Sequence, residues 1–422
     1  MPVAASAHAV LLRGTPSDRQ TLERSPEQVQ LLFSEPLDQV FSSIRVIDPG
    51  GQRVDRGDGR VDANNDRLLV VSLQPGLPNG VYTVVWRNLS AIDVHPDEGQ
   101  YQLFVGVPVA ARRAQVSVIT ATPATTLGRW WFYVAASLFG GVLAAWKLVL
   151  SPALAGVAGV GDVATPRARH MASQNVSRLV VAGGVLLIVG TLFTALAQAA
   201  AAANTSLIGA FGQPLADLLL RGRFAAIWWP RIALEVASLV LVAAGGIDGV
   251  AAESALATLP AVLLTSAITS HGAALPEGAL LGIAIDWLHI VGATAWVGGL
   301  IGLLVCLPIV RTRAHAPGST IARFGRYALI ASLLVLLSGA LQAGLEVGSA
   351  AALVSTTYGE LVLVKVGLLA AMLLLALSNE WRARRASPPG VSRGVRAELL
   401  VGVVVLGVAA MLSGTPPSPL GA

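Results

Sequence analysis

The sequence is poor in charged residues and in cysteine. Of its 422 residues, 13% are charged and 54% are hydrophobic, whereas a soluble domain has about 25% charged residues. Together with a mean hydropathy of +0.67, this excludes an ordinary soluble protein and predicts that most of the chain lies in lipid. The single cysteine, Cys306, lies in an apolar run, so the chain has neither an internal disulfide nor a thiolate metal cage.

Other features that are absent or weak in the sequence exclude further classes of function. Four methionines are too few for a thioether pathway for Cu(I). The sequence has no phosphate-binding glycine loop, which excludes ATP as a direct driving force. The net charge of +5 does not indicate a nucleic-acid partner, because the arginines cluster in short loops between apolar runs. We therefore expect membrane lipid as a partner and no nucleic acid.

The amino terminus lacks both the charged region and the apolar run of a secretory signal. Ala5-Ser6-Ala7 nevertheless has the small residues of a cleavage site, directly before His8. We expect that the start is truncated or misassigned, that residues 1–7 are a residual processing segment, and that the mature protein begins at His8.

Residues 8–107 have ordinary polarity and are expected to form an all-β domain. Short apolar stretches alternate with turns of Gly, Pro and Asn, a pattern typical of a sandwich or barrel. About 100 residues are enough to bury one core without disulfides. The predicted strands are 29–33, 44–47, 68–73, 81–86 and 101–105.

Three residues of this domain could bind a metal ion. A free amino-terminal His8 would offer its α-amine and its ring nitrogen, and Asp93 and His95 lie in a loop between two predicted strands. These nitrogen and oxygen donors make up the tetragonal set that Cu(II) prefers. The spacing alone is weak evidence, because a loop Asp-x-His is usually an ordinary surface feature.

Motifs spread over most of this domain make a resemblance specific. They are residues 8–11, 15–16, 32–37, 77–87 and 90–96, followed by Gly99. In these stretches the domain resembles the CopC family of periplasmic copper-binding proteins, which have a cupredoxin-like or immunoglobulin-like Greek-key sandwich. The resemblance implies that His8, Asp93 and His95 bind Cu(II).

The same resemblance implies a supporting role for Glu35, which matches a family glutamate that orients the site. Read alone, Glu35 is an ordinary acidic residue at the end of a strand. The family usually has Ser-Ala-Asp-Gly-His, whereas Ile92 is an insertion before Asp93 here. The methionine-rich stretch that some members use for Cu(I) is absent, so we expect a site for Cu(II) only.

After a linker at 108–128, the chain is apolar from residue 129 to residue 415. A membrane-spanning helix needs about 20 mostly apolar residues, and eight stretches meet this requirement. We therefore expect an all-α bundle of eight transmembrane helices, followed by a tail at 416–422. The candidate spans are 129–150, 178–203, 225–247, 251–271, 278–308, 324–347, 359–381 and 397–415.

The distribution of Lys and Arg in the loops predicts the orientation. One side holds Lys147, Arg167, Arg169, Arg178, Arg311, Arg313, Arg323, Arg326, Arg382, Arg384, Arg385, Arg393 and Arg396. The other side holds Arg129, Arg221, Arg223 and Arg231. The richer side should be cytoplasmic, which places the β domain and the carboxyl terminus outside the cytoplasmic membrane of a bacterium.

The polar segment 204–224 is expected to be an excursion on the outer side rather than a span. It holds either a short interfacial helix that ends at the aromatic pair Trp228-Trp229 or a plain connecting loop. The sequence favours neither.

Ionisable residues within spans are costly and suggest function. The candidates for a membrane copper site or path are Glu235, His271, Asp286, His289, Glu346 and Lys365. Asp286 and His289 are three residues apart and share one helix face, and we expect a metal or proton role for His271 and His289. Alternatively, Lys365 pairs with Glu235 or Glu346 to hold helices together, and each histidine is only a hydrogen-bonding residue.

Motifs in the apolar part carry a second resemblance. They are Ser270-His271, Leu288-His289 with 292–300, then 323–326, 357–359 with Leu363 and Lys365, and 412–417. This part resembles the CopD family of copper-resistance inner-membrane proteins, and CopC–CopD fusions have this order. The resemblance implies copper uptake into the cytoplasm.

These observations predict a non-enzymatic copper-acquisition protein. The β domain would bind Cu(II), dock on the membrane domain and pass the ion to a site near His271 and His289. Three other classes stay open. The protein could be a membrane-anchored copper buffer, sensor or resistance protein without transport, a haem-binding electron carrier with His271 and His289 as axial ligands, or a copper oxygenase.

Overall fold

The computed structural model divides the chain into two compact units. It describes residues 9–108, 122–155, 164–275, 278–311, 316–347, 349–384 and 388–415. The first unit contains the amino-terminal β domain together with Ala195–Trp228 and Ile268–Ala279, and the second contains the remaining helical sequence. Two helical segments from later in the chain therefore belong to the same unit as the β domain.

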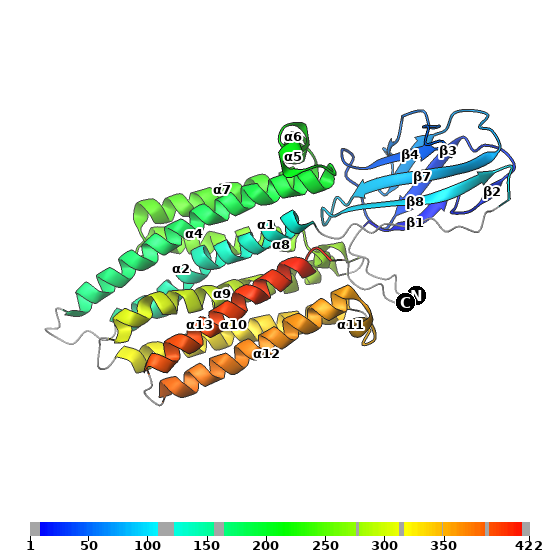
Figure 1. Cartoon of the computed structure of the whole chain (residues 1–422). Helices are drawn as coiled ribbons and strands as arrows, with labels where there is room; N and C mark the ends of the chain where they lie inside the picture. Colours follow the sequence, from blue (N-terminus) through cyan, green and yellow to red (C-terminus); the bar gives the residue numbers. More distant parts are fainter. Residues whose placement is uncertain are drawn as a thin grey trace. The chain divides into compact units, whose positions relative to one another are not determined.

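The β domain is a sandwich of two four-stranded sheets, as the sequence predicts (Figure 1). The strands are β1 (Leu11–Thr15), β2 (Thr21–Leu22), β3 (Gln28–Phe33), β4 (Ser43–Ile47), β5 (Arg60–Val61), β6 (Leu68–Ser72), β7 (Gly80–Leu89) and β8 (Pro96–Val105). One sheet has the order β1-β3-β6-β5 and the other β2-β8-β7-β4. All neighbours are antiparallel except β2 and β8.

Alternating side chains of both sheets form one core. Along β7, Tyr82, Val84 and Trp86 point inward and are buried while their neighbours are more exposed, as expected from the two-residue period of a strand. The Trp86 ring lies over Gly99, its cross-strand partner, where a Cβ atom would approach the ring to 2.3 Å. Position 99 therefore has to be glycine, because any side chain there would overlap the Trp86 ring.

All five predicted strands are present, but the last two are longer than predicted. β7 and β8 are paired from Gly80 with Val105 to Leu89 with Pro96. The residues from Pro96 to Gly99 have low strand propensity, so the sequence places the start of β8 too late. The ladder with β7 overrides that local preference. The short strands β1, β2 and β5 were not predicted.

The first unit also contains the end of one long helix and several short helical segments. They are the last turns of α4 (Ala164–Ala202), α5 (Leu207–Ala210), α6 (Gln213–Leu220), the start of α7 (Gly222–Gly245), and the 3-10 helix His271–Ala274. The segment 204–224 thus holds two short helices. The expectation that such a helix ends at Trp228-Trp229 is wrong, because both tryptophans lie within α7.

The described residues contain eight helical segments long and apolar enough to span a membrane, the number that the sequence predicts. They are Pro123–Ala155, Arg169–Ala202, Gly222–Gly245, Val250–Ala267, Ala279–Pro308, Arg323–Glu346, Thr357–Arg382 and Val391–Leu412. The first begins six residues before the expected span, within the region assigned to a linker. The fourth ends at Ala267, so the expectation that His271 lies at the end of a span is wrong.

The first span is not a uniform α-helix. It consists of α1 (Pro123–Ala136), α2 (Val142–Ala145) and α3 (Ser151–Ala155), separated by π-helical segments at Ser137–Gly141 and Trp146–Leu150. The remaining helices are α8 (Val250–Ala267), α9 (Ala279–Arg311), α10 (Ala316–Glu346), α11 (Ala352–Ser355), α12 (Thr357–Arg384) and α13 (Pro388–Leu412).

Small residues let the first π-helical segment and α9 approach closely in the second unit. A Cβ atom on Gly141 would lie 2.1 Å from the Thr294 carbonyl oxygen, and one on Gly298 would lie 2.4 Å from the Gly141 Cα atom. Such backbone-to-backbone contact requires glycine on both sides, and small residues are the usual means of packing helices in lipid.

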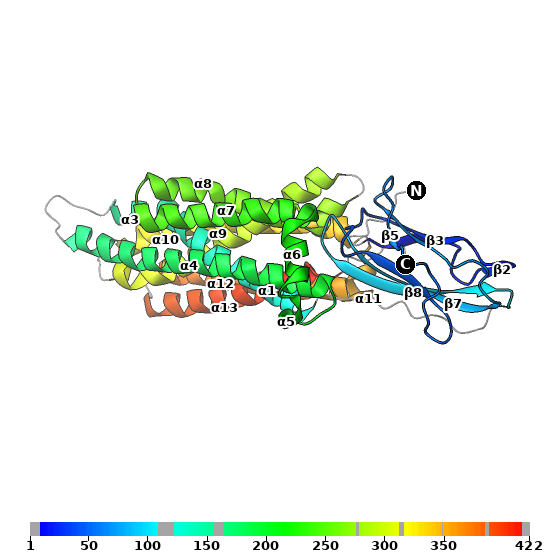
Figure 2. The ribbon, with the colours of Figure 1, turned by 90° about the horizontal axis from the view of Figure 1, so that it is seen from above.

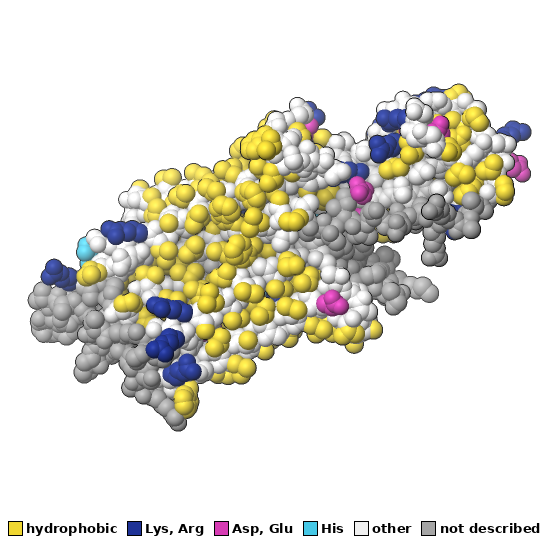
Figure 3. All heavy atoms as spheres, viewed as in Figure 1, with side chains coloured by type: hydrophobic (Ala, Val, Ile, Leu, Met, Phe, Trp, Pro, Cys, Tyr) yellow, Lys and Arg dark blue, Asp and Glu magenta, His cyan; other side chains and the backbone are white. Residues whose placement is uncertain are grey.

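The surface of the second unit matches that of a membrane domain. Hydrophobic side chains cover the helices along their length, with Lys and Arg side chains near one end (Figure 3). The start of α4, the end of α12 and the start of α13 lie at one end of the bundle in both ribbon views (Figures 1 and 2). These ends carry Arg167, Arg169, Arg382, Arg393 and Arg396, all of which the sequence assigns to one side of the membrane.

Candidate metal centre

The loop between β7 and β8 carries two of the predicted ligands, Asp93 and His95. Its shape is held by side-chain hydrogen bonds. Ser90 Oγ accepts from the backbone N–H groups of Ile92 at 3.0 Å and Asp93 at 3.3 Å. The Asp93 Oδ1 atom accepts from the His95 N–H at 3.1 Å. Such local bonds from Ser and Asp stabilise a turn in place of a strand.

Val94, between the two predicted ligands, has a left-handed backbone with φ of 58°. This conformation is unfavourable for a β-branched residue and costs about 1–3 kcal/mol. Two contacts stabilise it. The buried Val94 side chain packs in a cluster with Leu89 and Ala202, and the Gln198 side-chain amide donates to the Val94 carbonyl. The loop is therefore fixed against the end of α4.

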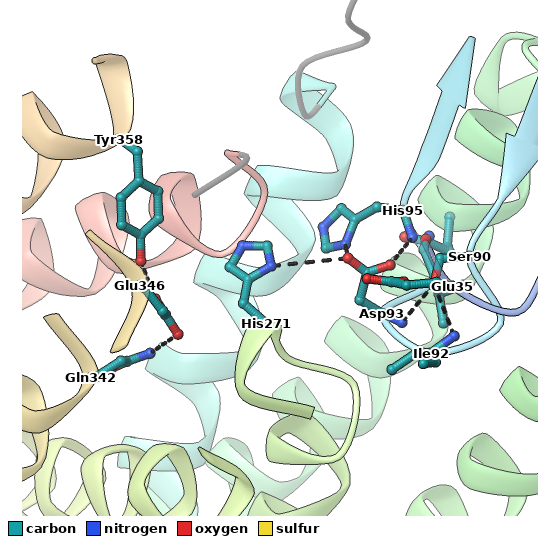
Figure 4. Close-up of polar contacts among 11 residues, drawn as sticks. Glu35, Ser90, Ile92, Asp93, His95, His271, Gln342, Glu346 and Tyr358 are labelled. Atoms are coloured by element: carbon teal, nitrogen blue, oxygen red, sulfur yellow. Dashed lines mark hydrogen bonds and ion pairs between the residues drawn. The ribbon is translucent and has the colours of Figure 1, made fainter. Parts of the chain in front are cut away.

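Asp93, His95 and His271 converge in the first unit (Figure 4). The Asp93 Oδ2 atom lies 3.0 Å from His95 Nδ1 and 4.0 Å from His271 Nδ1. One ligand-type atom from each residue lies within 4.8 Å of the others. The three residues are 3%, 7% and 6% exposed, so the cluster is shielded from solvent.

These separations fit a common metal ion. With metal–ligand bonds of about 2.0 Å, neighbouring ligands at right angles lie about 2.8 Å apart and opposite ligands about 4 Å apart. The two distances from Asp93 Oδ2 correspond to one neighbouring and one opposite ligand. Two imidazole nitrogens and a carboxylate oxygen suit Cu(II) in a tetragonal arrangement and also Zn²⁺ in a tetrahedral one.

Glu35 supports this loop through Ser90. Its side chain is 2% exposed, and its Oε2 atom accepts a hydrogen bond from Ser90 Oγ at 2.5 Å (Figure 4). Burial, with a further contribution from the charge of Asp93, raises the pKa of Glu35 to about 8. Ser90 Oγ also accepts from the Asp93 N–H. Glu35 is therefore connected to the candidate ligand Asp93 through Ser90.

Contacts from other parts of the β domain also fix it to the helical segments of the first unit. The Arg87 guanidinium donates to the Ala201 carbonyl in the last turn of α4, an oxygen that also accepts from the Asn204 N–H at 3.3 Å. Burial lowers the pKa of Arg87. Phe41 packs against a cluster that includes Ala200 and Leu218. The loop and the helical segments thus form one packed unit.

His271 begins the 3-10 helix that follows α8. The sequence assigns it to a membrane site with His289, whereas the structure places it with Asp93 and His95. Its imidazole is stacked against that of His95, with ring centroids 5.4 Å apart. One sequence signal could have placed His271 with the β domain. The sequence assigns both to the outer side of the membrane.

His8, the third predicted ligand, lies outside the described residues. The residue that follows it is well held. Ala9 is 1% exposed, and its carbonyl oxygen accepts from the Asn88 side-chain amide at 2.7 Å. Asn88 lies in β7, two residues before the loop residue Ser90.

In the second unit, His289 has partners at both ring nitrogens. Lys365 Nζ lies 3.1 Å from its Nε2 atom, and Ser338 Oγ lies 3.0 Å from its Nδ1 atom. Because an ammonium group has no acceptor, Lys365 donates to Nε2, and the ring proton lies on Nδ1. Metal binding at Nε2 therefore requires that Lys365 move away. Its ammonium contacts His289, and the alternative that Lys365 pairs with Glu235 or Glu346 stays a prediction.

A second polar group in this unit joins Asp286 and Glu346. The Gln342 amide donates to Asp286 Oδ1 at 2.5 Å and to Glu346 Oε1 at 3.2 Å, and the Tyr358 hydroxyl donates to Glu346 Oε2 (Figure 4). Asp286 and His289 both contact α10, through Gln342 and Ser338, which confirms that they share one face of α9. Sequence reasoning missed Gln342, although it lies four residues before Glu346.

Glu235 belongs to a separate contact within the second unit. Its Oε1 atom accepts from the Thr191 hydroxyl at 2.9 Å and lies 3.5 Å from Arg231 Nε. The pairing with Arg231, one helical turn earlier on α7, gives this carboxylate a structural partner. It shares none of these contacts with His289.

Comparison with known families divides the chain into two matched regions. Residues 11–106 match the family described as CopC domain, and residues 318–412 match the family described as Copper resistance protein D. The first region ends just after β8, and the second extends from α10 to the end of α13.

Relatives and a solved structure are similar to the whole chain or to one of its parts. The chain is 28% identical over 434 residues to the copper transport protein CutJ of Bacillus subtilis, covering 99% of this chain and 76% of CutJ. It is 29% identical over 218 residues to the inner membrane protein YebZ of Escherichia coli, covering 49% of this chain and 73% of YebZ. The crystal structure of CopC from Methylosinus trichosporium OB3b is 33% identical and covers 23% of this chain and 93% of that chain, with a TM-score of 0.21.

Proposed function

This chain is a fusion of a CopC domain with a CopD domain, and on that premise we propose that it acquires copper at the bacterial cytoplasmic membrane. One observation carries the proposal. Asp93 and His95 meet in a buried cluster of nitrogen and oxygen donors, in the loop that the CopC resemblance singles out. The name of the relative CutJ, a copper transport protein, supports the same function.

The β domain captures Cu(II) outside the cell through Asp93 and His95, with His8 adding its α-amine and imidazole after processing. Ala9, the residue after His8, is fastened to Asn88 near the start of the ligand loop, which supports this assignment. Glu35 acts as a positioning residue, because its hydrogen bond orients Ser90, and Ser90 in turn holds the Asp93 backbone.

The arginine-rich end of the helical bundle faces the cytoplasm, and the β domain and the carboxyl terminus face outward. The excess of basic residues in the loops on one side supports this orientation. The resulting topology places the candidate copper ligands on the side from which an imported ion arrives.

From the β domain the ion passes into the membrane domain, where His289 is the next ligand. Its Nε2 lone pair becomes available when Lys365 withdraws, so that Lys365 acts as a gate. Asp286 and Glu346, which share the amide of Gln342, provide negative charge for a passing cation. Glu235 is a further ionisable residue on this path.

Copper accumulation in cells tests the function together with Cu(II) affinity of the purified full chain. Asp93→Ala and His95→Ala should lower both. His289→Ala should lower accumulation while Cu(II) affinity stays at the wild-type value. The control is His170→Ala, because His170 is exposed and lies outside the metal cluster. Normal accumulation in Asp93→Ala and His95→Ala cells would refute copper acquisition through this site.

A membrane-anchored copper buffer is the second candidate, favoured by the contact between Lys365 and His289. That contact occupies the ring nitrogen that transport requires. A buffer needs the β-domain site but no route through the helices, so His289→Ala cells would accumulate copper normally.

A further inference from the structure

We propose that His271 binds the same copper ion as Asp93 and His95, so that the metal ties the β sandwich to the segment Ile268–Ala279. The inference rests on the proposed copper site and adds to it a ligand from the helical part of the chain. His271 lies about 175 residues beyond the β-domain ligands in the sequence, a separation that only the tertiary structure closes.

The first argument is geometric. The Nδ1 atoms of His95 and His271 lie 3.0 Å and 4.0 Å from the same Asp93 oxygen. These distances fit neighbouring and opposite ligands of one ion, and the two rings are inclined by only 29°. All three side chains point toward one another in Figure 4.

The second argument is chemical. His271 is 6% exposed, in a 3-10 helix whose residues are all buried, and it lies beside a carboxylate and another imidazole. Two neutral imidazoles and one carboxylate are donors that Cu(II) accepts, and together they fill three of its coordination positions.

The third argument is that the cluster is held in place by contacts that do not use the side chains of the metal ligands. Gln198 and Arg87 fix the ligand loop and β7 to the end of α4. The Arg223 guanidinium, at the start of α7, donates to the Ile268 carbonyl at 3.5 Å, three residues before His271. The ligands are therefore brought together by packing of the unit before the ion binds.

Two consequences follow. Three side-chain ligands suffice for a copper site, so Cu(II) binds the full chain even when His8 is not the first residue. The ion is also already bound to a residue of the segment that joins α8 to α9. Transfer toward the helices then requires release by Asp93 and His95, not a separate docking encounter.

Pulsed electron paramagnetic resonance of Cu(II) in the purified full chain tests the inference. In a His8→Ala chain we expect the copper signal to show coupling to two imidazoles, from His95 and His271. Adding His271→Ala should reduce this to one imidazole and weaken Cu(II) binding at least tenfold. His170→Ala serves as the matched control and should leave both unchanged.

The outcomes separate this inference from the proposed function. A single coupled imidazole in the His8→Ala chain, with loss of binding in Asp93→Ala, would refute the role of His271 and leave the copper site of the β domain intact. Wild-type binding in Asp93→Ala and His95→Ala would refute the proposed site itself.

A measurement on the unmutated chain covers the case in which His271→Ala does not fold. Cu(II) should slow amide hydrogen exchange in residues 271–274 as well as in residues 90–95. Slowing restricted to 90–95 would contradict a ligand in the helical segment.

Discussion

The imidazole of His271 is stacked on that of His95, with ring centroids 5.4 Å apart and ring planes inclined by 29°. One ring comes from a loop of the β sandwich and the other from a 3-10 helix between two apolar helices. The Asp93 Oδ2 atom lies 3.0 Å from His95 Nδ1 and 4.0 Å from His271 Nδ1. The Asp93 carboxylate is therefore next to both histidines of the proposed copper site.

Asp93→Asn should reveal the contribution of this carboxylate. The substitution keeps the side-chain shape but removes the negative charge and the anionic oxygen ligand. We expect Cu(II) affinity to fall about 100-fold, which corresponds to about 2.8 kcal/mol. Competition with a chelator of known affinity measures the change. Asp97→Asn, in β8, is the matched control, and an equal loss in both variants would contradict the assignment.

Gly298→Ala should destabilise the helical bundle. The added Cβ atom would lie 2.4 Å from both the Gly141 Cα atom and the Ser137 carbonyl oxygen, and backbone cannot yield as a flexible side chain does. Overpacking of this kind costs about 1–3 kcal/mol. Thermal unfolding in detergent should show a lower midpoint. Gly325→Ala is the control, because nothing lies within 4 Å of its Cβ position, and its midpoint should be unchanged or higher.

Tyr358→Phe should also destabilise the bundle, because it removes a hydrogen bond to a buried carboxylate. The Tyr358 hydroxyl donates to Glu346, which also accepts from the Gln342 amide. Removing a donor from a buried carboxylate costs about 1–3 kcal/mol. The unfolding midpoint should fall in Tyr358→Phe and fall no further when Glu346→Gln is added. Additive losses would indicate that the two residues act independently.

Lys365→Leu should expose the copper-binding capacity of His289. The substitution removes both the hydrogen bond to Nε2 and a positive charge that repels a metal cation. We expect the purified protein to retain more copper per chain than the wild type, measured by elemental analysis. The excess should disappear in Lys365→Leu with His289→Ala. Equal copper content in Lys365→Leu and wild type would show that His289 does not compete with Lys365 for copper.

Glu35→Gln should flatten the pH dependence of stability of the metal-free protein. The pKa of Glu35 is raised from 4.5 to about 8, mainly by burial and then by Asp93. Folding therefore favours the protonated form of Glu35. The contribution of this group to the free energy of unfolding is complete below about pH 4.5 and is lost as the pH rises through about 8. The wild-type unfolding midpoint should fall over this interval by more than that of Glu35→Gln. Parallel curves for the two proteins would contradict a raised pKa at this carboxyl.

Local patterns were sufficient for much of the architecture. Apolar runs of about 20 residues predicted eight spans because lipid requires that each crossing satisfy its own backbone hydrogen bonds. Alternating strands between Gly, Pro and Asn turns predicted the sandwich for a similarly local reason. The errors occurred at ends of elements, as at Pro96 in β8 and Pro123 in α1, where pairing or packing partners decide how far an element continues.

The sequence by itself determined a β sandwich followed by an apolar helical domain, and the motif containing Asp93 and His95. These depend on composition and periodicity, which each segment carries within itself. Only the tertiary structure decided that His271 lies beside Asp93 and that Lys365 Nζ contacts the Nε2 atom of His289. Both relationships connect residues on separate elements, whose meeting depends on packing that no local pattern encodes.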